Sequence, residues 1–570
     1  MNIHDKTPRA GQAWPVARGR TRARTASLVA LAALHAAALV ILVLTESQVV
    51  PQTAFLLSWG FFNFAWIVML RRPAVAAAIA LACLGLLVVL SQLKHEVLLT
   101  TVNFIDLMLI DPDTATFLVH VFPNLDLIAV VTGLAGVLAL IVLWRIDVLR
   151  PSRSRAAIGA TACFAGLVGL SIAAPSDPWD EFLRENYFSK FMRSAVTITG
   201  DVLERGIFDK APAGSVEVAN APEQVCRPER PPHIIMIHDE SSFDARAIPG
   251  IKVPAGYGEH FKSFDGKARK LLVEGAGGPS WYTEYNVLTG LSGRSFGRLI
   301  EFVTRIAAGR VHRGLPRTLA DCGYKTFTLY SMYGSFMSAR RFQESTGIQH
   351  FLDSRALGAV RLEPDSFYFN AAIDVLKAES RSEPLFMLVY LAQNHFPWNF
   401  RFRPDLARDW VQPGNREDVD EYLRRQHLTA ADYKAFVKRL EREFPDERFL
   451  IVRFGDHQPY FARHLIDESQ NDSMLVRRIA QGDPRFLETY YAIDAINFRP
   501  RELGTALDRL DAPYLPLVIL EAAGVPLDAT FVEQKRILER CRGIFYRCLA
   551  GAEARWFNRF LIDKGLITGL

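Results

Sequence analysis

This chain lacks a large excess of either positive or negative charge. Its 570 residues include 66 Lys and Arg against 61 Asp and Glu, which gives a formal net charge of only +5 at pH 7. So small an excess does not favour a nucleic-acid-binding protein. Half of the residues are apolar, and the length predicts at least two domains.

Five long segments contain no charged residue at all. Each is about as long as a bilayer-spanning helix requires. A secretory signal peptide would give one such segment, so five predict a retained membrane domain over residues 27–174. Buried core helices are the alternative, which is weak for five in a row. The segments are residues 27–45, 53–70, 74–90, 127–144 and 156–174.

Three clusters of arginine lie beside these segments. One precedes the first segment, one separates the second from the third, and one separates the fourth from the fifth. The positive-inside rule therefore predicts a basic cytoplasmic N-terminus over residues 1–26, five crossings, and an external location for everything after residue 174. The clusters are Arg18, Arg20, Arg22 and Arg24; Arg71 and Arg72; and Arg145, Arg150, Arg153 and Arg155.

The external loop 91–126 is too polar to cross the membrane and partly amphipathic. It would either lie along the membrane surface, shaping a cavity for a lipid head group, or serve only as a connector.

The remaining sequence is that of a soluble domain. Residues 175–230 predict a juxtamembrane helix and a polar linker, and residues 231–570 alternate short β-type runs with amphipathic helical stretches. The runs "HIIMIH", "KTFTLYS", "LFMLVYL" and "RFLIVRFG" are almost continuously apolar, as in sheets covered on both faces. We therefore expect an α/β fold, in which ligands bind beyond the carboxyl ends of the strands.

Cysteine is also scarce, with six residues in the chain. Cys83 and Cys163 fall in the predicted membrane segments. The other four fall in the external part, where an oxidising compartment permits two disulfides in three possible pairings. Unpaired buried cysteines are the alternative. The four are Cys226, Cys322, Cys541 and Cys548, of which the last two are close enough in sequence to pair.

Three of the β-type runs end in polar residues that a core does not require. Singly, each has an ordinary explanation as a helix cap, a core histidine or a turn residue. Together they predict a divalent metal site, because strand ends of one sheet converge and carboxylate and imidazole groups are metal ligands. The residues are Asp239 and Glu240, Asn394 and His395, and Asp456 and His457.

A candidate nucleophile lies in "EGAGGPSWYTEYNVLTGLSGRSFG", residues 274–297. The glycine-rich part ends at Ser280, and a helix is predicted to begin there. A hydroxyl at a helix N-terminus faces unpaired N–H groups and the positive end of the dipole, which suits an attacked phosphate. Coordination to a metal would activate this hydroxyl. The alternative is that Ser280 only caps the helix.

These motifs resemble the alkaline phosphatase and sulfatase superfamily. Within it, the layout is similar to the membrane-anchored branch of lipoteichoic acid synthases, phosphoglycerol transferases and phosphoethanolamine transferases, over nearly the whole chain. The resemblance implies a sulfatase-like domain over residues 231–570 that binds one divalent ion, zinc or manganese. It implies Glu240, Asp456, His457 and Ser280 as metal ligands, Ser280 as the nucleophile, and His395 as a group that binds phosphate or moves a proton.

The chain departs from this family pattern in several places. Ser280 stands where the lipoteichoic acid synthases usually have Thr. The phosphate-binding arginine is displaced by one position, which favours Arg340 over Arg341, and Tyr330 replaces a frequent His.

The segment "CRPER", residues 226–230, fits the C-x-P-x-R motif from which sulfatases make formylglycine. It precedes the first strand, however, whereas the sulfatase motif follows it, so we do not expect sulfate-ester chemistry.

The function implied is transfer of a phospholipid head group, phosphoglycerol or phosphoethanolamine, through a phosphoserine. The donor would be a membrane phospholipid and the acceptor an envelope glycan or a lipid-linked sugar. The implied location is the bacterial inner membrane, with the catalytic domain in the periplasm. Two alternatives stay open: a phosphodiesterase, in which water replaces the acceptor, and a non-catalytic partner in envelope assembly that keeps the fold.

Overall fold

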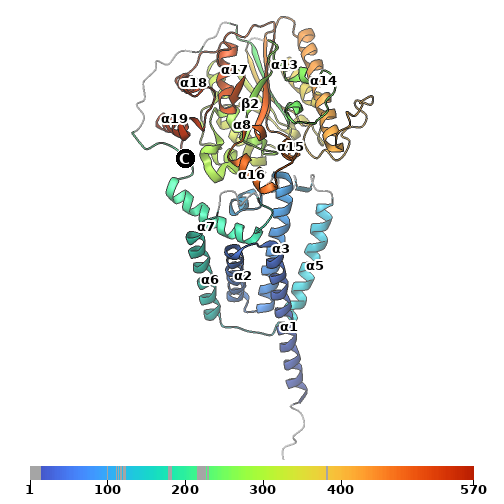
Figure 1. Cartoon of the computed structure of the whole chain (residues 1–570), viewed down its shortest axis with the longest axis vertical. Coiled ribbons are helices and arrows are strands. Elements are labelled where there is room, and N and C mark those ends of the chain that lie inside the picture. Colours follow the sequence, from blue (N-terminus) through green and yellow to red (C-terminus); the bar gives the residue numbers. More distant parts are fainter. Residues whose placement is uncertain are drawn as a thin grey trace, which may run out of the picture. The chain divides into compact units, whose positions relative to one another are not determined.

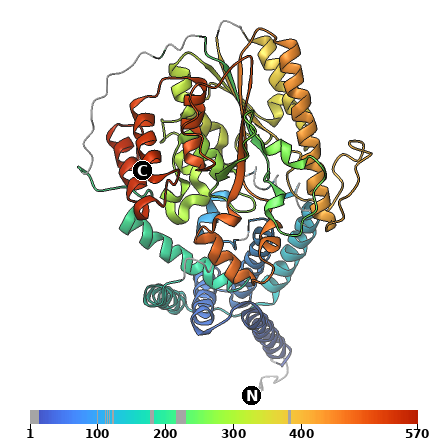
Figure 2. The same cartoon turned by 45° about the horizontal axis from the view of Figure 1, so that its top comes forward.

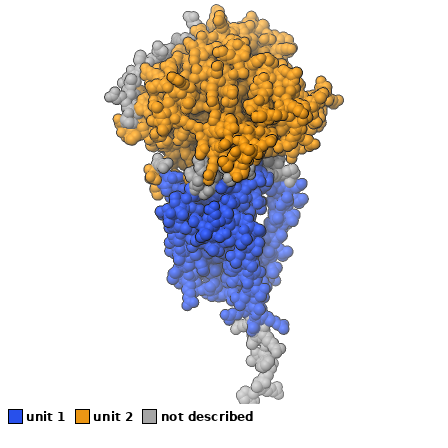
Figure 3. All heavy atoms as spheres, viewed as in Figure 1, with its two compact units in different colours: residues 1–201 blue, residues 202–570 orange. Residues whose placement is uncertain are grey.

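The computed structural model describes residues 14–570 except 99, 111, 113, 114, 116, 117, 120–123, 177–182, 215–225, 227–229 and 380–382. The chain divides into two compact units, Met1–Asp201 and Val202–Leu570, which Figure 3 colours separately. Parts of the predicted external loop 91–126 and of the predicted linker lie outside the described residues. Within that loop, a 3₁₀ helix covers Phe104–Leu109.

The first unit contains five helices that are long and apolar enough to cross a membrane (Figure 1). Each overlaps one of the five uncharged segments, so the prediction of five membrane helices is confirmed. They are α1 (Trp14–Thr45), α2 (Val49–Leu70), α3 (Pro73–Leu98), α5 (Leu125–Ile146) and α6 (Arg153–Ala173).

Helices α2 and α6 approach each other closely because glycines lie where they meet. A Cβ atom at Gly60 would lie 2.8 Å from Sγ of Cys163, and one at Gly159 would lie 2.9 Å from the ring of Phe64. Small residues at such positions allow two membrane helices to pack backbone to backbone.

A sixth helix, α7 (Tyr187–Arg205), begins in the first unit and is amphipathic. Its start is fixed by the buried carboxylate of Glu46, which accepts hydrogen bonds from the Phe188 N–H (3.1 Å) and the Ser189 hydroxyl (2.5 Å). A carboxylate at this end of a helix pairs with otherwise unsatisfied N–H groups and with the positive end of the dipole.

The second unit is built on one eight-stranded sheet with the order β4-β3-β5-β1-β6-β7-β2-β8. Strands β4, β3, β5, β1 and β6 run parallel, and β7 is antiparallel to both β6 and β2. The strands are β1 (His233–Asp239), β2 (Arg269–Leu272), β3 (Lys325–Leu329), β4 (His350–Leu352), β5 (Leu385–Tyr390), β6 (Phe449–Gly455), β7 (Glu488–Ile496) and β8 (Arg509–Asp511).

Helices cover both faces of this sheet, as the apolar runs predict. On one face α13 and α14 pack on alternate residues of the central strands, among them Ile235 and Ile237 of β1. On the other face α17 packs on β6 and α8. Figure 2 shows the sheet between these two sets of helices. The helices of this unit of six or more residues are α8 (Ser280–Thr289), α10 (Leu315–Asp321), α11 (Ala339–Ser345), α13 (Asp365–Ala378), α14 (Glu417–Glu443), α16 (Asp472–Ala480), α17 (Leu515–Ala523), α18 (Ala529–Cys541) and α19 (Ala552–Asp563).

The four apolar runs correspond to β1, β3, β5 and β6, the central part of the sheet. The chain thus consists of five apolar N-terminal helices followed by a mixed α/β domain. The two antiparallel pairings of β7 and the short edge strands β4 and β8 were not predicted.

Candidate metal centre

The carboxyl ends of β1 and β6 bring three potential metal ligands together. These strands pair in parallel with Asp239 opposite Gly455, so Glu240 and Asp456 leave the sheet at the same level. Glu240, Asp456 and His457 are all buried, and one ligand atom from each lies within 4.8 Å of the others. The sequence predicts these three residues at one site, and the structure brings them together.

Asp239 and Glu240 point in different directions, as neighbours along a strand do. Oδ2 of Asp239 accepts hydrogen bonds from the Tyr490 hydroxyl (2.5 Å) and from Nε2 of His260 (3.0 Å). These bonds hold the pKa of Asp239 below its usual value in spite of burial. Asp239 is therefore a structural carboxylate, and Glu240 is the one that faces Ser280.

Asp456 has one satisfied oxygen and one that lacks a donor. Oδ1 accepts from the backbone N–H groups of Ser241 (2.7 Å) and His457 (2.9 Å). Oδ2 is completely buried, and no described residue donates a hydrogen bond to it. A buried carboxylate oxygen without a partner is costly, and a bound cation would satisfy it.

His457 presents its Nε2 atom to the same point. Its Nδ1 donates to the backbone carbonyl of Gln458 (2.9 Å), which leaves the lone pair of Nε2 free for a metal. Nε2 lies 3.7 Å from Oε1 of Glu240 and 3.2 Å from Oδ2 of Asp456. The preceding Gly455 is required for this path of the chain, because a Cβ atom there would lie 1.8 Å from the carbonyl oxygen of Ser242.

Ser280 is the first residue of α8, and its hydroxyl completes the cluster. Oγ lies 3.4 Å from Oε2 of Glu240 and 3.4 Å from Nε2 of His457. The N-cap position of α8 belongs to Pro279, and no side chain caps the helix. The hydroxyl of Thr283, one turn along α8, donates to the backbone carbonyl of Asp456 (2.6 Å) and fixes the helix to the metal-ligand loop.

The cluster concentrates negative charge in a buried space. Burial is the largest cause that raises the pKa of Glu240 well above its usual value, and the charge of Asp456 raises it further. A divalent cation would remove this conflict. Two carboxylates, one imidazole and one hydroxyl suit either zinc or manganese, so the residues present fit the ion implied by the sequence.

His238 is a neighbour of the cluster that the sequence did not single out. It lies two residues before Glu240 on the same face of β1, and its Nε2 is 3.2 Å from Oδ2 of Asp456. Its ring packs edge-on against Tyr390 and stacks on Phe454. Burial lowers the pKa of His238 to about 4, so the ring is neutral at pH 7. The alternation of β1 is the signal that could have identified it.

His395 lies in the loop after β5, within electrostatic reach of Asp456 and His457. Its Nδ1 donates to the backbone carbonyl of Phe396 (2.7 Å), so Nε2 carries the lone pair. Burial lowers the pKa of His395 to about 4. The ring is therefore neutral at pH 7 and can accept a proton at Nε2.

Arg425, on α14, fixes the loop that carries His395. Its guanidinium is completely buried and donates to the backbone carbonyls of His395 (2.7 Å), Pro397 (2.9 Å) and Phe400 (3.1 Å). Its Nε also donates to Glu421 (2.8 Å), which neutralises the buried charge. Nothing in the sequence around Arg425 indicated this role.

Arg340, which is predicted to bind phosphate, contacts two other residues of the domain in the structure. Its guanidinium donates to the Phe351 carbonyl (2.9 Å) and pairs with Asp353 (3.2 Å). None of the interactions described for it involves the metal cluster. Arg341 lies instead beside Gly309. Two non-glycine residues with positive φ, Met337 (49°) and Ser338 (59°), turn the chain just before these arginines.

Tyr330, which follows β3, is buried near the cluster. Its ring packs edge-on against Tyr390 at 4.7 Å. Burial, followed by the charges of Glu284 and Glu240, raises its pKa well above the usual value, so its hydroxyl stays protonated.

The four cysteines of the second unit form two disulfides, Cys226–Cys322 and Cys541–Cys548. Cys226 is the residue that the C-x-P-x-R motif would convert to formylglycine. In the structure its sulfur is bonded to that of Cys322.

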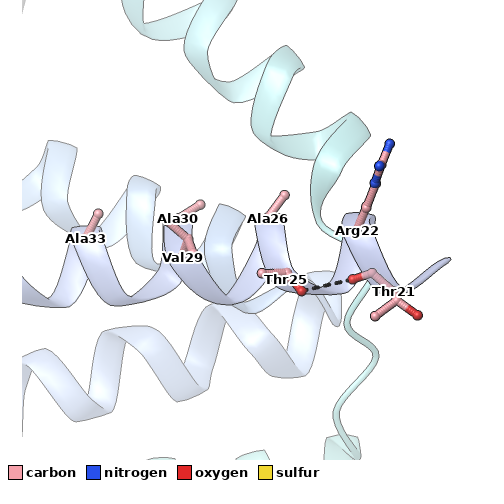
Figure 4. A pocket seen from close by; sticks show the side chains of 7 residues that line it. All are labelled: Thr21, Arg22, Thr25, Ala26, Val29, Ala30 and Ala33. Atoms are coloured by element: carbon pink, nitrogen blue, oxygen red, sulfur yellow. Dashed lines mark hydrogen bonds between the residues drawn. The ribbon is translucent and has the colours of Figure 1, made fainter. Parts of the chain in front are cut away.

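A shallow hollow of about 570 Å³ lies along α1 (Figure 4). All seven residues that line it come from this one membrane helix, and alanines are the most numerous. It contains no carboxylate, histidine or cysteine, so we assign no chemistry to it. The lining residues are Thr21, Arg22, Thr25, Ala26, Val29, Ala30 and Ala33.

Residues 277–477 match the family model described as Sulfatase. The match covers about a third of the chain and includes Ser280, Asp456 and His457. No sequence match is found among functionally curated proteins.

Three of the solved structures that are similar to parts of this chain are transferases or synthases. The phosphoglycerol transferase GacH of Streptococcus pyogenes, in complex with sn-glycerol-1-phosphate, is 14% identical over 59% of this chain and 85% of its own, with a TM-score of 0.45. The phosphoethanolamine transferase EptA of Neisseria meningitidis is 11% identical over 86% of this chain and 98% of its own, with a TM-score of 0.47. The lipoteichoic acid synthase LtaP of Listeria monocytogenes is 16% identical over 52% and 72%, with a TM-score of 0.38.

Proposed function

We propose that the chain transfers the head group of a membrane phospholipid, phosphoglycerol or phosphoethanolamine, to an envelope glycan or a lipid-linked sugar. The observation that carries this proposal is the position of the Ser280 hydroxyl, 3.4 Å from both Glu240 and His457 in a cluster that could hold a cation. A hydroxyl beside a metal site is the arrangement required for attack on phosphorus.

The reaction has two steps, and each forms one bond to phosphorus, breaks another and moves one proton. In the first, Oγ of Ser280 forms a bond to phosphorus and loses its proton, while the bond from phosphorus to the diacylglycerol oxygen breaks and that oxygen gains a proton. In the second, the oxygen of an acceptor hydroxyl forms a bond to phosphorus and loses its proton, while the bond from phosphorus to Oγ of Ser280 breaks and Oγ gains a proton. We assign the proton movement to Nε2 of His395, which is neutral and free to accept.

Glu240, Asp456, His457 and Ser280 would hold the divalent ion, zinc or manganese. Bound there, the ion would stabilise charge on the phosphoryl oxygens and lower the pKa of the hydroxyl. Tyr330 is proposed to contact the substrate through its protonated hydroxyl. Arg340 stays a weaker candidate for phosphate binding, because it would have to leave Asp353.

The test uses the purified full-length protein with fluorescent phosphatidylglycerol and phosphatidylethanolamine. We expect release of fluorescent diacylglycerol that a chelator stops and added zinc or manganese restores. Ser280→Ala should abolish release, and Ser280→Thr, which keeps a hydroxyl, should retain a measurable part. Equal release by Ser280→Ala and the parent would contradict the assignment of the nucleophile.

The same assay separates the alternatives. Diacylglycerol release without any modified acceptor would indicate a phosphodiesterase. No release from any donor, with metal present, would favour a non-catalytic partner in envelope assembly. Mass spectrometry of envelope glycans from cells with and without the protein would identify the head group by the mass it adds.

We also propose that the protein lies in the bacterial inner membrane with residues 175–570 in the periplasm. The three arginine clusters, on one side of a five-helix arrangement, support this topology. Reporter enzymes active only outside the cytoplasm, fused after residue 150 or after residue 205, should be inactive and active respectively. The reverse result would overturn it.

A further inference from the structure

A groove of about 440 Å³ lies beside the loop that carries His395. It is formed by the chain that follows this histidine and by the first turns of α14. The lining residues are Trp398, Asn399, Phe400, Arg401, Trp410, Gln412, Arg416, Glu417, Asp418, Asp420, Glu421 and Arg424.

Aromatic rings form the apolar part of this groove. Trp398 is buried, whereas the side chain of Phe400 is 48% exposed. The indole N–H of Trp410 is shielded from solvent, and no described residue accepts a hydrogen bond from it. The groove therefore offers a ligand the ring of Trp410, and not its N–H.

The charged groups of the groove largely neutralise one another. Arg424 pairs with Glu421 (2.8 Å), and Arg416 pairs with Asp418 (2.6 Å). Asp420 accepts hydrogen bonds from the backbone of Gly414 and from Asn415. The groove therefore has no surplus of positive charge for a phosphate. It offers ring faces together with carboxylate and carboxamide groups, which match the C–H faces and hydroxyls of a sugar.

The groove and the candidate catalytic histidine are held by one buried cluster. Arg425 donates to the carbonyls of His395 and Phe400, and Arg424 donates to those of Phe402 and Leu406. Glu421 binds both arginines. Since His395 and Trp398 are three residues apart, their Cα atoms lie within about 11 Å of each other.

We propose that this groove binds a sugar residue of the glycan that accepts the phosphoryl group. The inference rests on the proposed transferase function and specifies its acceptor. A sugar stacked on Trp410 and Phe400 would lie near His395, which is proposed to accept the proton of the sugar hydroxyl. The shared arginine cluster would keep the sugar and His395 in a fixed relative position.

The test is direct binding of glycans to the full-length protein in lipid nanodiscs. Detergents with sugar head groups must be avoided, because they would compete. The probe is an array of bacterial envelope glycans and defined oligosaccharides of glucose, galactose, mannose and N-acetylhexosamines. We expect the parent protein to bind at least one class, and Trp410→Ala to weaken that binding by about tenfold or more.

Two further variants keep the test decisive. Gln412→Ala changes an exposed lining residue that folding does not need, and should weaken binding by about fivefold. Val411→Ala, at a neighbouring residue that is 82% exposed and does not line the groove, should bind as the parent does. Binding of no glycan, or binding that neither Trp410→Ala nor Gln412→Ala weakens, would overturn the proposal.

The experiments distinguish failure of the glycan-binding proposal from failure of the transferase proposal. Glycan binding does not need the nucleophile, so Ser280→Ala should bind the same glycans as the parent. If glycans bind and no diacylglycerol is released from any donor, the groove stands and the transferase assignment fails. If diacylglycerol is released in a Ser280-dependent way and no glycan binds, the groove assignment fails alone.

Discussion

The hydroxyl oxygen of Ser280 lies 3.4 Å from Nε2 of His457, although 177 residues separate them in the chain. Both atoms carry lone pairs, and so do the neighbouring oxygens of Glu240 and Asp456. The serine has one proton to donate, which cannot satisfy all of these acceptors. The site is thus a concentration of electron pairs around one point, and this arrangement is typical of metal ligands.

Glu240→Gln should remove the metal. The variant loses the charge of one ligand, and we expect metal affinity to fall by more than about 100-fold. Metal content of the purified protein, measured by mass spectrometry, gives the answer. Asp239→Asn is the matched control, since it makes the same change in the adjacent residue. It should keep the metal and lose about 1–3 kcal/mol of stability, because His260 and Tyr490 lose a charged partner. Equal loss of metal in both variants would contradict the assignment.

His395 should make the protein sensitive to acid between pH 6.5 and pH 4. In this interval the unfolded chain binds a proton at His395 while the folded chain, with its pKa lowered to about 4, does not. Stability therefore falls as the pH falls through the interval, by about 1–2 kcal/mol after allowance for the partial exposure of the ring. Thermal unfolding of chelator-treated protein should show a smaller dependence on pH for His395→Asn.

His350→Asn is the control for that experiment, since this histidine is exposed and distant in sequence from the site. Its melting temperature should vary with pH as that of the parent does. An unchanged pH dependence in His395→Asn would show that the ring is not held neutral by the fold.

Arg425→Lys should lower kcat of diacylglycerol release by about 10- to 100-fold with little change in KM. Lysine keeps the charge beside Glu421 but lacks the fork of donors that holds three carbonyls, so His395 loses its fixed position. Arg439→Lys, on the same helix, alters an arginine that pairs with Glu443 (3.0 Å), and should leave kcat unchanged. A normal kcat in Arg425→Lys would contradict a positioning role.

Cys226→Ser should lower the melting temperature and keep diacylglycerol release. Its disulfide with Cys322 closes a loop of 96 residues, and the loss of such a constraint costs up to about 5 kcal/mol. Cys541→Ser opens a separation of only 7 residues and should cost less. Loss of release in Cys226→Ser, with the protein still folded, would reopen formylglycine chemistry.

The parts of the fold that could be predicted from the sequence are those with the strongest apolar signal. The five membrane helices and the strands β1, β3, β5 and β6 are almost continuously apolar, because lipid or helices surround them. Strands β4 and β8 have three residues each, and β2 alternates buried and exposed side chains. Their pairing depends on neighbours distant in sequence, and the short runs themselves do not indicate it.

The convergence of Glu240, Asp456 and His457 was predictable because these residues follow predicted strands, whose ends converge. The contacts of Arg340 were not predictable, because the chain before it turns through two non-glycine residues with positive φ, a backbone conformation that their side chains do not favour. His238 resembled a core residue of β1, and Arg425 lies in a helix whose buried charges are visible only once its partners are in place. The groove at Trp410 likewise depends on tertiary packing.

The ligands of the candidate metal centre are spread from Glu240 to His457, across most of the sheet in sequence. During synthesis, Asp456 and His457 are therefore made only after more than two hundred residues have followed Glu240. Uptake of an ion at this site would then be a late event of folding, after long-range strand pairing. The ion would come from the compartment in which the domain completes its fold.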